Sequence, residues 1–252
     1  MYRLFTLITA IAACGLLVSS ATAQPTANPS TQQQTSSFTT RRSIDESTPI
    51  FDKETGKRIS LKEFSRLQDA DPNGYHLEPI FDEYGKVSRY QLRATNAEEK
   101  QTHQIRTRDP AWQPKVSDAM PSFVMRGIDK QTYRSTDSKG RVVVLFFWLN
   151  LRKPFWNADQ GQRIADLMRP SKTETEPIAL GVLNSSEEEI SELLKTQTLP
   201  FIPIPDSIGF HQKFSIMTFP SFLVIDRNGK VAAFIEGSDY EQLKQVLAKV
   251  SR

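Results

Sequence analysis

The stretch Arg141-Val-Val-Val-Leu-Phe-Phe-Trp-Leu-Asn-Leu-Arg-Lys-Pro-Phe-Trp156 decides the fold of this 252-residue chain. Its apolar run from Val142 to Trp148 is too short to cross a membrane and too continuous for a strand with one wet face. The run therefore predicts a central strand that is buried on both faces. A short loop follows. Pro154 is then placed to begin a helix, because the first helical turn needs no N–H from that residue.

Two motifs in the second half of the chain resemble the TlpA-like thioredoxins. Residues Phe147 to Phe155 are similar to the Phe-Trp-Ala-x-Trp-Cys-x-Pro-Cys stretch of that family. Residues Phe219 to Asp226, Phe-Pro-Ser-Phe-Leu-Val-Ile-Asp, resemble its Thr-Pro-Thr-x-Phe-x-Ile-Asp, in which the proline follows a cis peptide bond. The resemblance runs from Met120 to the end of the chain and implies a cis bond before Pro220.

Arg152 and Phe155 stand where the resemblance places the two redox cysteines. Disulfide exchange needs a thiolate and a second, resolving sulfur, and peroxide reduction also needs a thiolate. Guanidinium and phenyl groups supply neither, and Phe146 replaces a buried acid that some thioredoxins carry. We therefore expect a vestigial redox site at Arg152, Lys153, Pro154 and Phe155, with no catalytic residue.

In active relatives an extended substrate peptide lies in the groove beside the proline. Trp156, Phe219 and Pro220, together with Phe155, are therefore candidates for an apolar surface that binds a partner. The alternative is that Phe155 and Trp156 divide between the core and a covered crevice. We expect Phe155 to plug the site. Arg152 either contacts an anion on a partner or is simply a solvated side chain, and the second interpretation is favoured.

The N-terminus has the pattern of a signal peptide, residues 1–23. Arg3 precedes an apolar segment, and Ala21-Thr-Ala23 forms a cleavage site. The only cysteine, Cys14, also fits a lipobox, so a lipoprotein anchored through Cys14 is the alternative to cleavage. Cleavage would leave no sulfur nucleophile and no disulfide. The sequence thus predicts a periplasmic or secreted protein that meets a membrane only if it is lipidated.

Two segments precede the thioredoxin-like domain, for which we predict residues 119–252. Residues 24–43 are rich in Gln, Ser and Thr and predict a flexible linker. Residues 44–108 predict a small α+β region of unknown role, in which Pro49-Ile-Phe-Asp52 and Pro79-Ile-Phe-Asp82 each open a hairpin with a Gly-Lys turn. Ser60 caps a helix between the two hairpins. The polar residues 96–114 predict a linker.

Within the thioredoxin-like domain, strands and helices alternate. This pattern indicates an α/β fold, a central mixed sheet flanked by helices. The residues at 178–183 predict a buried strand, and Ser185 and Ser238 predict helix caps. Asn228-Gly229 predicts a two-residue hairpin with positive φ at both positions.

Other chemistry finds little support in the sequence. The three histidines, His76, His103 and His211, lack the spacing of metal ligands, so we expect neither a metal nor another cofactor. His211 is expected on the surface of a helix. The net charge of +3 is too balanced to indicate nucleic-acid binding.

These observations favour an exported, redox-inactive protein, not an enzyme, that binds a protein or peptide partner in the cell envelope. The groove beside the vestigial site would hold that partner. One alternative is a non-catalytic subunit of an oxidoreductase or peroxidase system that uses a partner's cysteines. Another is a structural role in which the thioredoxin-like fold is a spacer.

Overall fold

The computed structural model describes residues 44–105, 108–137, 139–169 and 176–250. The predicted signal peptide, Cys14 and the linker at 24–43 lie outside the described residues. Among the described helices, none combines the length and the apolar character that a membrane span requires.

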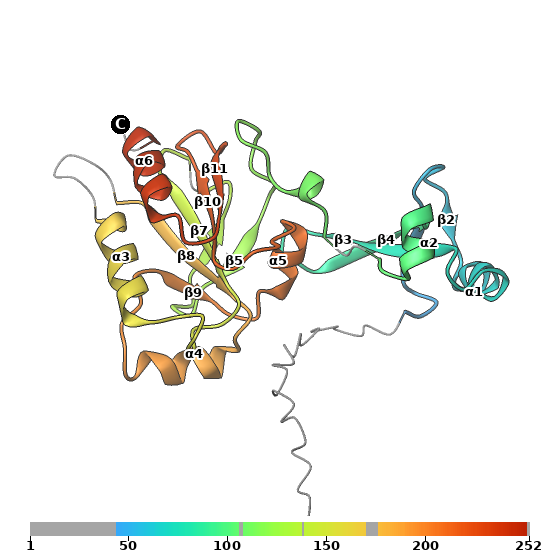
Figure 1. Ribbon diagram of the computed structural model, residues 1–252, viewed down its shortest axis with the longest axis horizontal. Helices are drawn as coiled ribbons and strands as arrows, with labels where there is room; N and C mark the ends of the chain where they lie inside the picture. Colours follow the sequence, from blue (N-terminus) through green and yellow to red (C-terminus); the bar gives the residue numbers. More distant parts are fainter. Residues whose placement is uncertain (1–43, 106–107, 138, 170–175, 251–252) are drawn as a thin grey trace, which may run out of the picture. The chain divides into compact units, whose positions relative to one another are not determined.

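A five-stranded mixed sheet forms the centre of the second half of the chain (Figure 1). Its strand order is β11-β10-β7-β8-β9. Strands β7, β8 and β9 run parallel, whereas β10 is antiparallel to both β7 and β11. The strands are β7 (Val143–Trp148), β8 (Ile178–Leu183), β9 (Ile202–Ile204), β10 (Ser221–Ile225) and β11 (Val231–Glu236). The predicted central strand is confirmed.

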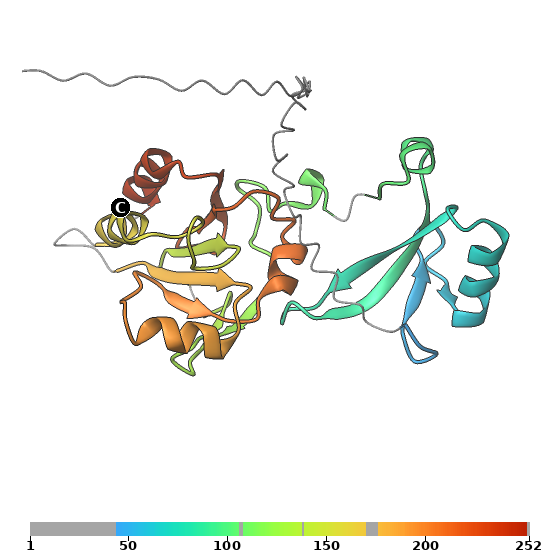
Figure 2. The ribbon, with the colours of Figure 1, turned by 60° about the horizontal axis from the view of Figure 1, so that its bottom comes forward.

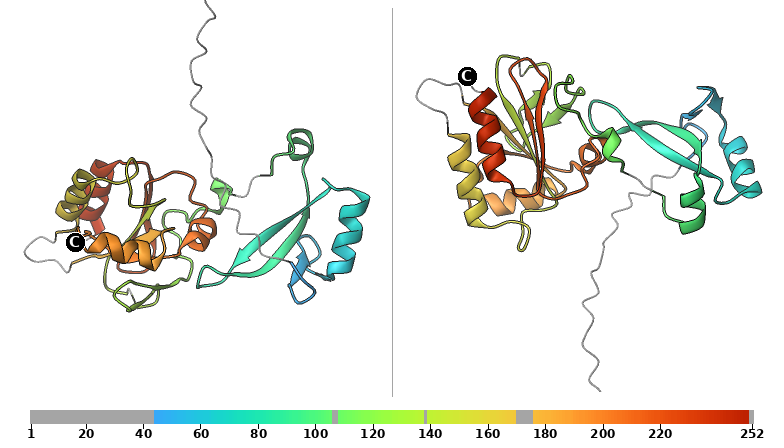
Figure 3. Two further views of the ribbon diagram at one scale, coloured as in Figure 1. Left: turned by 90° about the horizontal axis from the view of Figure 1, so that it is seen from below. Right: turned by 45° about the horizontal axis from the view of Figure 1, so that its top comes forward.

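Helices cover both faces of this sheet. They are α3 (Ala158–Met168), α4 (Glu187–Leu194), α5 (Ile208–Lys213) and α6 (Tyr240–Val250). Helices α3 and α6 lie side by side in every view (Figures 2 and 3) and contact each other directly. The order of a βαβ unit followed by an antiparallel ββα ending gives a thioredoxin-like α/β fold, as the sequence predicts.

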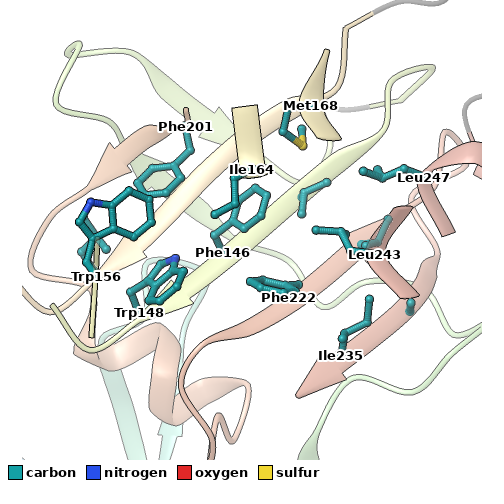
Figure 4. Packing of buried hydrophobic residues seen from close by; sticks show 14 of the residues in the cluster. Phe146, Trp148, Trp156, Ile164, Met168, Phe201, Phe222, Ile235, Leu243 and Leu247 are labelled. Atoms are coloured by element: carbon teal, nitrogen blue, oxygen red, sulfur yellow. The ribbon is translucent and has the colours of Figure 1, made fainter. Parts of the chain in front are cut away.

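Strand β7 supplies two cores by alternation. Val144, Phe146 and Trp148 face a cluster shared with α3, α4 and α6 (Figure 4). Val143, Leu145 and Phe147 face a second cluster shared with α5. All six are 0–1% exposed, and burying each contributes roughly 1.5–3 kcal/mol before the entropy cost of ordering.

Three helix starts differ from the sequence prediction. Helix α4 is capped by Ser186, whose hydroxyl accepts from the Glu189 N–H, and not by Ser185. Helix α6 follows Asp239, whose carboxylate accepts from the Gln242 N–H, and not Ser238. Helix α3 begins at Ala158 behind an Asn157 capping box, and not at Pro154. In each case the side chain that reaches the exposed N–H groups of the first turn sets the boundary.

The turn between β10 and β11 also differs from the prediction. The Gly229 N–H donates to the Asp226 carbonyl, and the Asp226 N–H donates to the Lys230 carbonyl. Only Gly229 of the predicted pair has a positive φ, of 77°. The connection is therefore longer than a two-residue hairpin, and it is accompanied by a register shift at Ile225.

The first half of the described chain forms a separate four-stranded sheet of order β2-β1-β4-β3, in which β1 and β4 are parallel. Ile50, Ile59, Phe64 and Leu92 form its core. Both predicted Gly-Lys hairpins are present, with φ near 70° at Gly56 and Gly85. The elements are β1 (Ile50–Asp52), β2 (Arg58–Ile59), α1 (Leu61–Ala70), β3 (Tyr75–Phe81), β4 (Val87–Ala94) and α2 (Ala97–Thr102).

The stretch 96–114, predicted as a linker, contains regular structure. Asn96 caps α2 through a complete capping box, and Pro110–Trp112 forms the 3-10 helix η1. A short antiparallel pair, β5 (Val124–Arg126) and β6 (Thr132–Arg134), follows. Capping side chains can order short polar helices that hydrophobic periodicity does not reveal.

The tip of the β3–β4 hairpin packs against α5. Lys213 Nζ donates to the backbone oxygens of Asp82 at 2.7 Å and Ser122 at 2.6 Å. The Val124 N–H donates to the Glu83 carbonyl at 2.7 Å. Backbone atoms of the tip are thus satisfied by groups from the thioredoxin-like part of the chain.

Candidate functional site

Strand register brings the two family-like motifs to one edge of the central sheet. Trp148, at the end of β7, lies opposite Leu183 at the end of β8, and Phe147 lies opposite Ser221 at the start of β10. The loop that leaves β7 and the loop that enters β10 are therefore neighbours. This edge of the sheet is our candidate site.

The residues predicted as a vestigial redox site, 152–155, form a turn that precedes the helix. The N–H groups of Phe155 and Trp156 both donate to the Arg152 carbonyl, at 2.9 and 3.0 Å. The Lys153–Pro154 peptide bond is cis. Because the Asn157 capping box starts α3 at Ala158, position 152 precedes the N-cap by five residues and lies outside the first turn of the helix. A group placed there gains little from the helix dipole, which acts within the first turn.

Arg152 has a partner within the chain. Its Nη2 lies 2.7 Å from Glu189 Oε1 in the first turn of α4. Both side chains are largely exposed, at 72% and 46%, so the ion pair contributes about 0–1 kcal/mol. The contact joins the turn at 151–156 to the helix that follows β8, and it occupies the guanidinium that was a candidate for a partner's anion.

Trp156 was wrongly predicted as part of a binding surface. It is 4% exposed, and its ring packs edge-on against Trp148 and Phe201, with centroid separations of 5.1 and 5.5 Å (Figure 4). Phe155 is 42% exposed, so it does not plug the site as expected. Adjacent turn residues point in opposite directions here, which sends one aromatic ring inward and the other to solvent.

The loop before β10 carries one half-buried and one exposed apolar side chain. The Phe219–Pro220 bond is cis, and the half-buried Phe219 ring lies 5.2 Å from the His211 ring. Met217, two residues earlier, is 49% exposed. The sequence analysis did not identify Met217 as a site residue, because its neighbours Ile216 and Phe219 are equally apolar. Which of these side chains is exposed depends on the path of the backbone into β10.

His211 lies beneath this loop and is fully buried, contrary to the predicted surface position. Its Nε2 is 2.9 Å from the Val182 carbonyl, so that nitrogen carries the proton. Burial lowers the pKa of His211 to about 4, with a further decrease from Arg108, although the Val182 bond opposes the shift. The ring is therefore neutral at physiological pH and packs as an aromatic group against Phe147.

No thiol lies among the described residues at this edge. The chain's one cysteine lies outside the described residues, and positions 152 and 155 hold Arg and Phe. No His, Cys, Asp or Glu cluster suited to a metal ion occurs among the described residues. The two large apolar side chains that this edge exposes are Phe155 and Met217, which lie on the neighbouring loops together with the exposed Arg152 and Lys153.

The chain has partial similarity to a few known proteins. No family model matches the chain. The chain is similar to the thioredoxin-like protein YneN of Bacillus subtilis (strain 168), with 22% identity over 116 residues, covering 44% of this chain and 65% of that protein. The match thus spans just under two thirds of the curated relative.

Two solved structures are among those with partial similarity to the chain. A putative thiol:disulfide interchange protein DsbE from Chlorobium tepidum has 22% sequence identity and a TM-score of 0.48, covering 55% of this chain and 99% of that one. The pneumococcal exposed lipoprotein thioredoxin Etrx1 from Streptococcus pneumoniae strain TIGR4 has 20% identity and a TM-score of 0.43, covering 51% and 99%.

Proposed function

We propose that this protein is exported, does not itself catalyse thiol–disulfide exchange, and binds an extended segment of a protein partner beside its vestigial redox site. The chemistry supports the second part of the proposal. Exchange requires two sulfur atoms, and the chain has one cysteine, at position 14 in the predicted leader. The leader pattern of residues 1–23 supports export.

The observation that carries the binding proposal is the exposure of Phe155 and Met217 on neighbouring loops. They are 42% and 49% exposed and lie at the edge where β7 ends and β10 begins. Covering a side chain of this kind contributes up to roughly 1.5–3 kcal/mol. An extended segment is the favoured occupant, because its alternate side chains can reach separate apolar contacts while its backbone follows the loop.

The test compares two double variants of the full chain. Phe155→Arg/Met217→Arg changes the proposed surface, while Tyr84→Arg/Val116→Arg changes exposed apolar residues elsewhere. A partner is captured from envelope extract by cross-linking, purified, and its affinity measured for each protein. We expect the first pair to weaken binding about 100-fold, at roughly 10-fold per contact, and the control to leave it unchanged. Equal loss in both pairs, or in neither, would contradict the proposal.

A separate assay tests the redox part. We expect the full chain alone to give no insulin reduction, and a positive result would overturn redox inactivity. Acceleration of a cysteine-bearing partner's own exchange by this chain would instead identify a non-catalytic subunit of an oxidoreductase. Binding without acceleration supports the proposed role.

A further inference from the structure

A second candidate site lies in the N-terminal region and shares no residue with the vestigial redox site. A cavity of about 500 Å³ is lined by residues from β3, β4, α2 and η1. The charged groups that line it are four carboxylates and two cations: Glu78, Glu98, Glu99, Asp109, Lys53 and Arg93. Its polar lining sets it apart from the apolar face at the sheet edge.

Arg93, Glu78 and Glu99, which line the cavity, form a network of ion pairs. Arg93 donates from Nε to Glu78 at 2.5 Å and from Nη2 and Nη1 to Glu99 at 2.6 and 2.7 Å. The hydrogen bonds from Arg93 lower the pKa of Glu99 to about 2. Burial disfavours the charged form of Glu78, but hydrogen bonds from Lys53 and Arg93 outweigh it and lower its pKa. Arg93 is thus committed to two ionised acids and is poorly placed to receive an anionic ligand.

At the rim of the cavity, the ammonium group of Lys53 contacts a carboxylate and an aromatic ring of the same chain. Lys53 Nζ lies 2.7 Å from Glu78 Oε2 and 5.9 Å from the centroid of the Trp112 ring. An alkylammonium group between a carboxylate and an indole face is a recognised mode of cation binding. Trp112 remains 44% exposed and Lys53 42% exposed, so solvent reaches both side chains and an external cation would compete with Lys53 for the ring.

We propose that the cavity binds an alkylammonium group, supplied by a lysine side chain of another protein or by a free diamine. Trp112 provides the aromatic face, and Asp109 contributes negative charge at the rim. A compact metal ion fits less well, because the described residues contain no cluster of metal-ligating side chains. Lys53 is a built-in competitor that partly fills the site.

The three tryptophans make a direct test possible, because Trp148 and Trp156 are buried and only Trp112 is exposed. The full chain is titrated with 1,5-diaminopentane while the three indole N–H signals are followed by NMR. We expect a saturable shift of the Trp112 signal alone, and no shift with 1,5-pentanediol. An equal response to the diol, or no response to the diamine, would overturn the proposal.

Variants sharpen the test through calorimetric affinity for the diamine. Trp112→Leu and Asp109→Asn should each weaken binding about 5-fold or more, and Lys53→Met should strengthen it by a similar factor. The control Phe155→Leu should change nothing, and weaker binding by Lys53→Met would also contradict the proposal. Tighter binding of acetyl-Gly-Lys-Gly-amide than of the diamine indicates a protein source for the cation, whereas equal or weaker binding indicates a free amine.

Discussion

At the scale of single residues, His211 should link stability to pH. Burial holds its folded pKa at about 4, below the ordinary value of 6.5. As the pH falls, the unfolded chain therefore takes up the proton first, and the folded state loses stability relative to it. We expect the contribution of neutral His211 to the free energy of unfolding to be fully present above pH 6.5. By pH 4 the free energy of unfolding should have fallen by roughly 3 kcal/mol. Urea denaturation across this range measures the loss.

Two histidine variants separate His211 from other titrating groups. His211→Gln should abolish most of the slope between pH 6.5 and 4.5, since carboxylates such as Glu99 titrate lower. His76, whose pKa is also lowered by burial, provides the control His76→Gln. If the slope persists in His211→Gln and vanishes in His76→Gln, the pH dependence of stability arises from His76, and the prediction for His211 is wrong.

Residue type explains why the burial of some side chains could be predicted from the sequence and that of others could not. The residues of β7 are apolar without interruption, and such runs have few exposed solutions in an α/β fold. Histidine and tryptophan occur both inside and outside proteins. The position of His211 depends on the Val182 carbonyl, and that of Trp156 on the Phe201 ring. Because those partners come from distant elements, no local pattern marks either residue as buried.

At the scale of elements, the cap of α4 offers a matched pair of adjacent serines. The Ser186 hydroxyl accepts from Glu189 N–H at 3.2 Å, whereas among the described residues the Ser185 hydroxyl has no side-chain hydrogen bond. We expect Ser186→Ala to cost about 1 kcal/mol of unfolding free energy and Ser185→Ala clearly less. Chemical denaturation measures both. A larger loss for Ser185→Ala than for Ser186→Ala would mean that Ser185 caps α4, as the sequence predicted.

The late start of α3 leads to a prediction about restored cysteines. In the variant Arg152→Cys/Phe155→Cys, position 152 precedes the Asn157 cap by five residues and lies outside the first turn of α3. The helix N-terminus therefore cannot stabilise a thiolate there, and we expect the pKa of the thiol introduced at position 152 to stay near about 8.5. The pH dependence of iodoacetamide alkylation measures it. A pKa below about 7 would show that the helix reaches position 152.

The element boundaries show why sequence patterns predict helices better than their ends. Ser185-x-x-Glu188 and Ser186-x-x-Glu189 both match a capping box, and Ser238 competes with Asp239 in the same way. Pro154 is an acceptable first residue, yet the Asn157-Gln160 pair forms the complete box. Local chemistry permits each option, and packing of the buried stripe selects one.

At the scale of the whole molecule, the contact between the β3–β4 tip and α5 was not predictable. It joins two glycines, Gly85 in the turn and Gly209 in the helix, which are far apart in sequence. A Cβ on Gly85 would lie 3.1 Å from the Phe210 ring. Glycine in a turn and glycine in a short helix each have ordinary local explanations. Only the close approach of the two backbones shows that these residues are needed together.

Gly209→Ala tests this contact because helix propensity and packing predict opposite signs. Alanine favours a helix over glycine by about 1 kcal/mol. A Cβ at position 209, however, would come within 1.8 Å of the Gly85 carbonyl oxygen, which is backbone and cannot rotate away. Overpacking of this kind typically costs about 1–3 kcal/mol, and an approach this close to backbone belongs at the upper end of that range, so we expect a net loss of about 2 kcal/mol.

A local readout distinguishes lost docking from general destabilisation. The Val124 N–H, which donates to Glu83 in the hairpin tip, should exchange with solvent faster in Gly209→Ala, while amides of β7 should change only as far as global stability does. Gln212→Ala, on the same helix, should leave both measurements within about 0.5 kcal/mol of the parent. Increased stability with unchanged exchange at Val124 would mean that the tip does not rest on α5. The thioredoxin-like sheet would then fold without constraint from the N-terminal region.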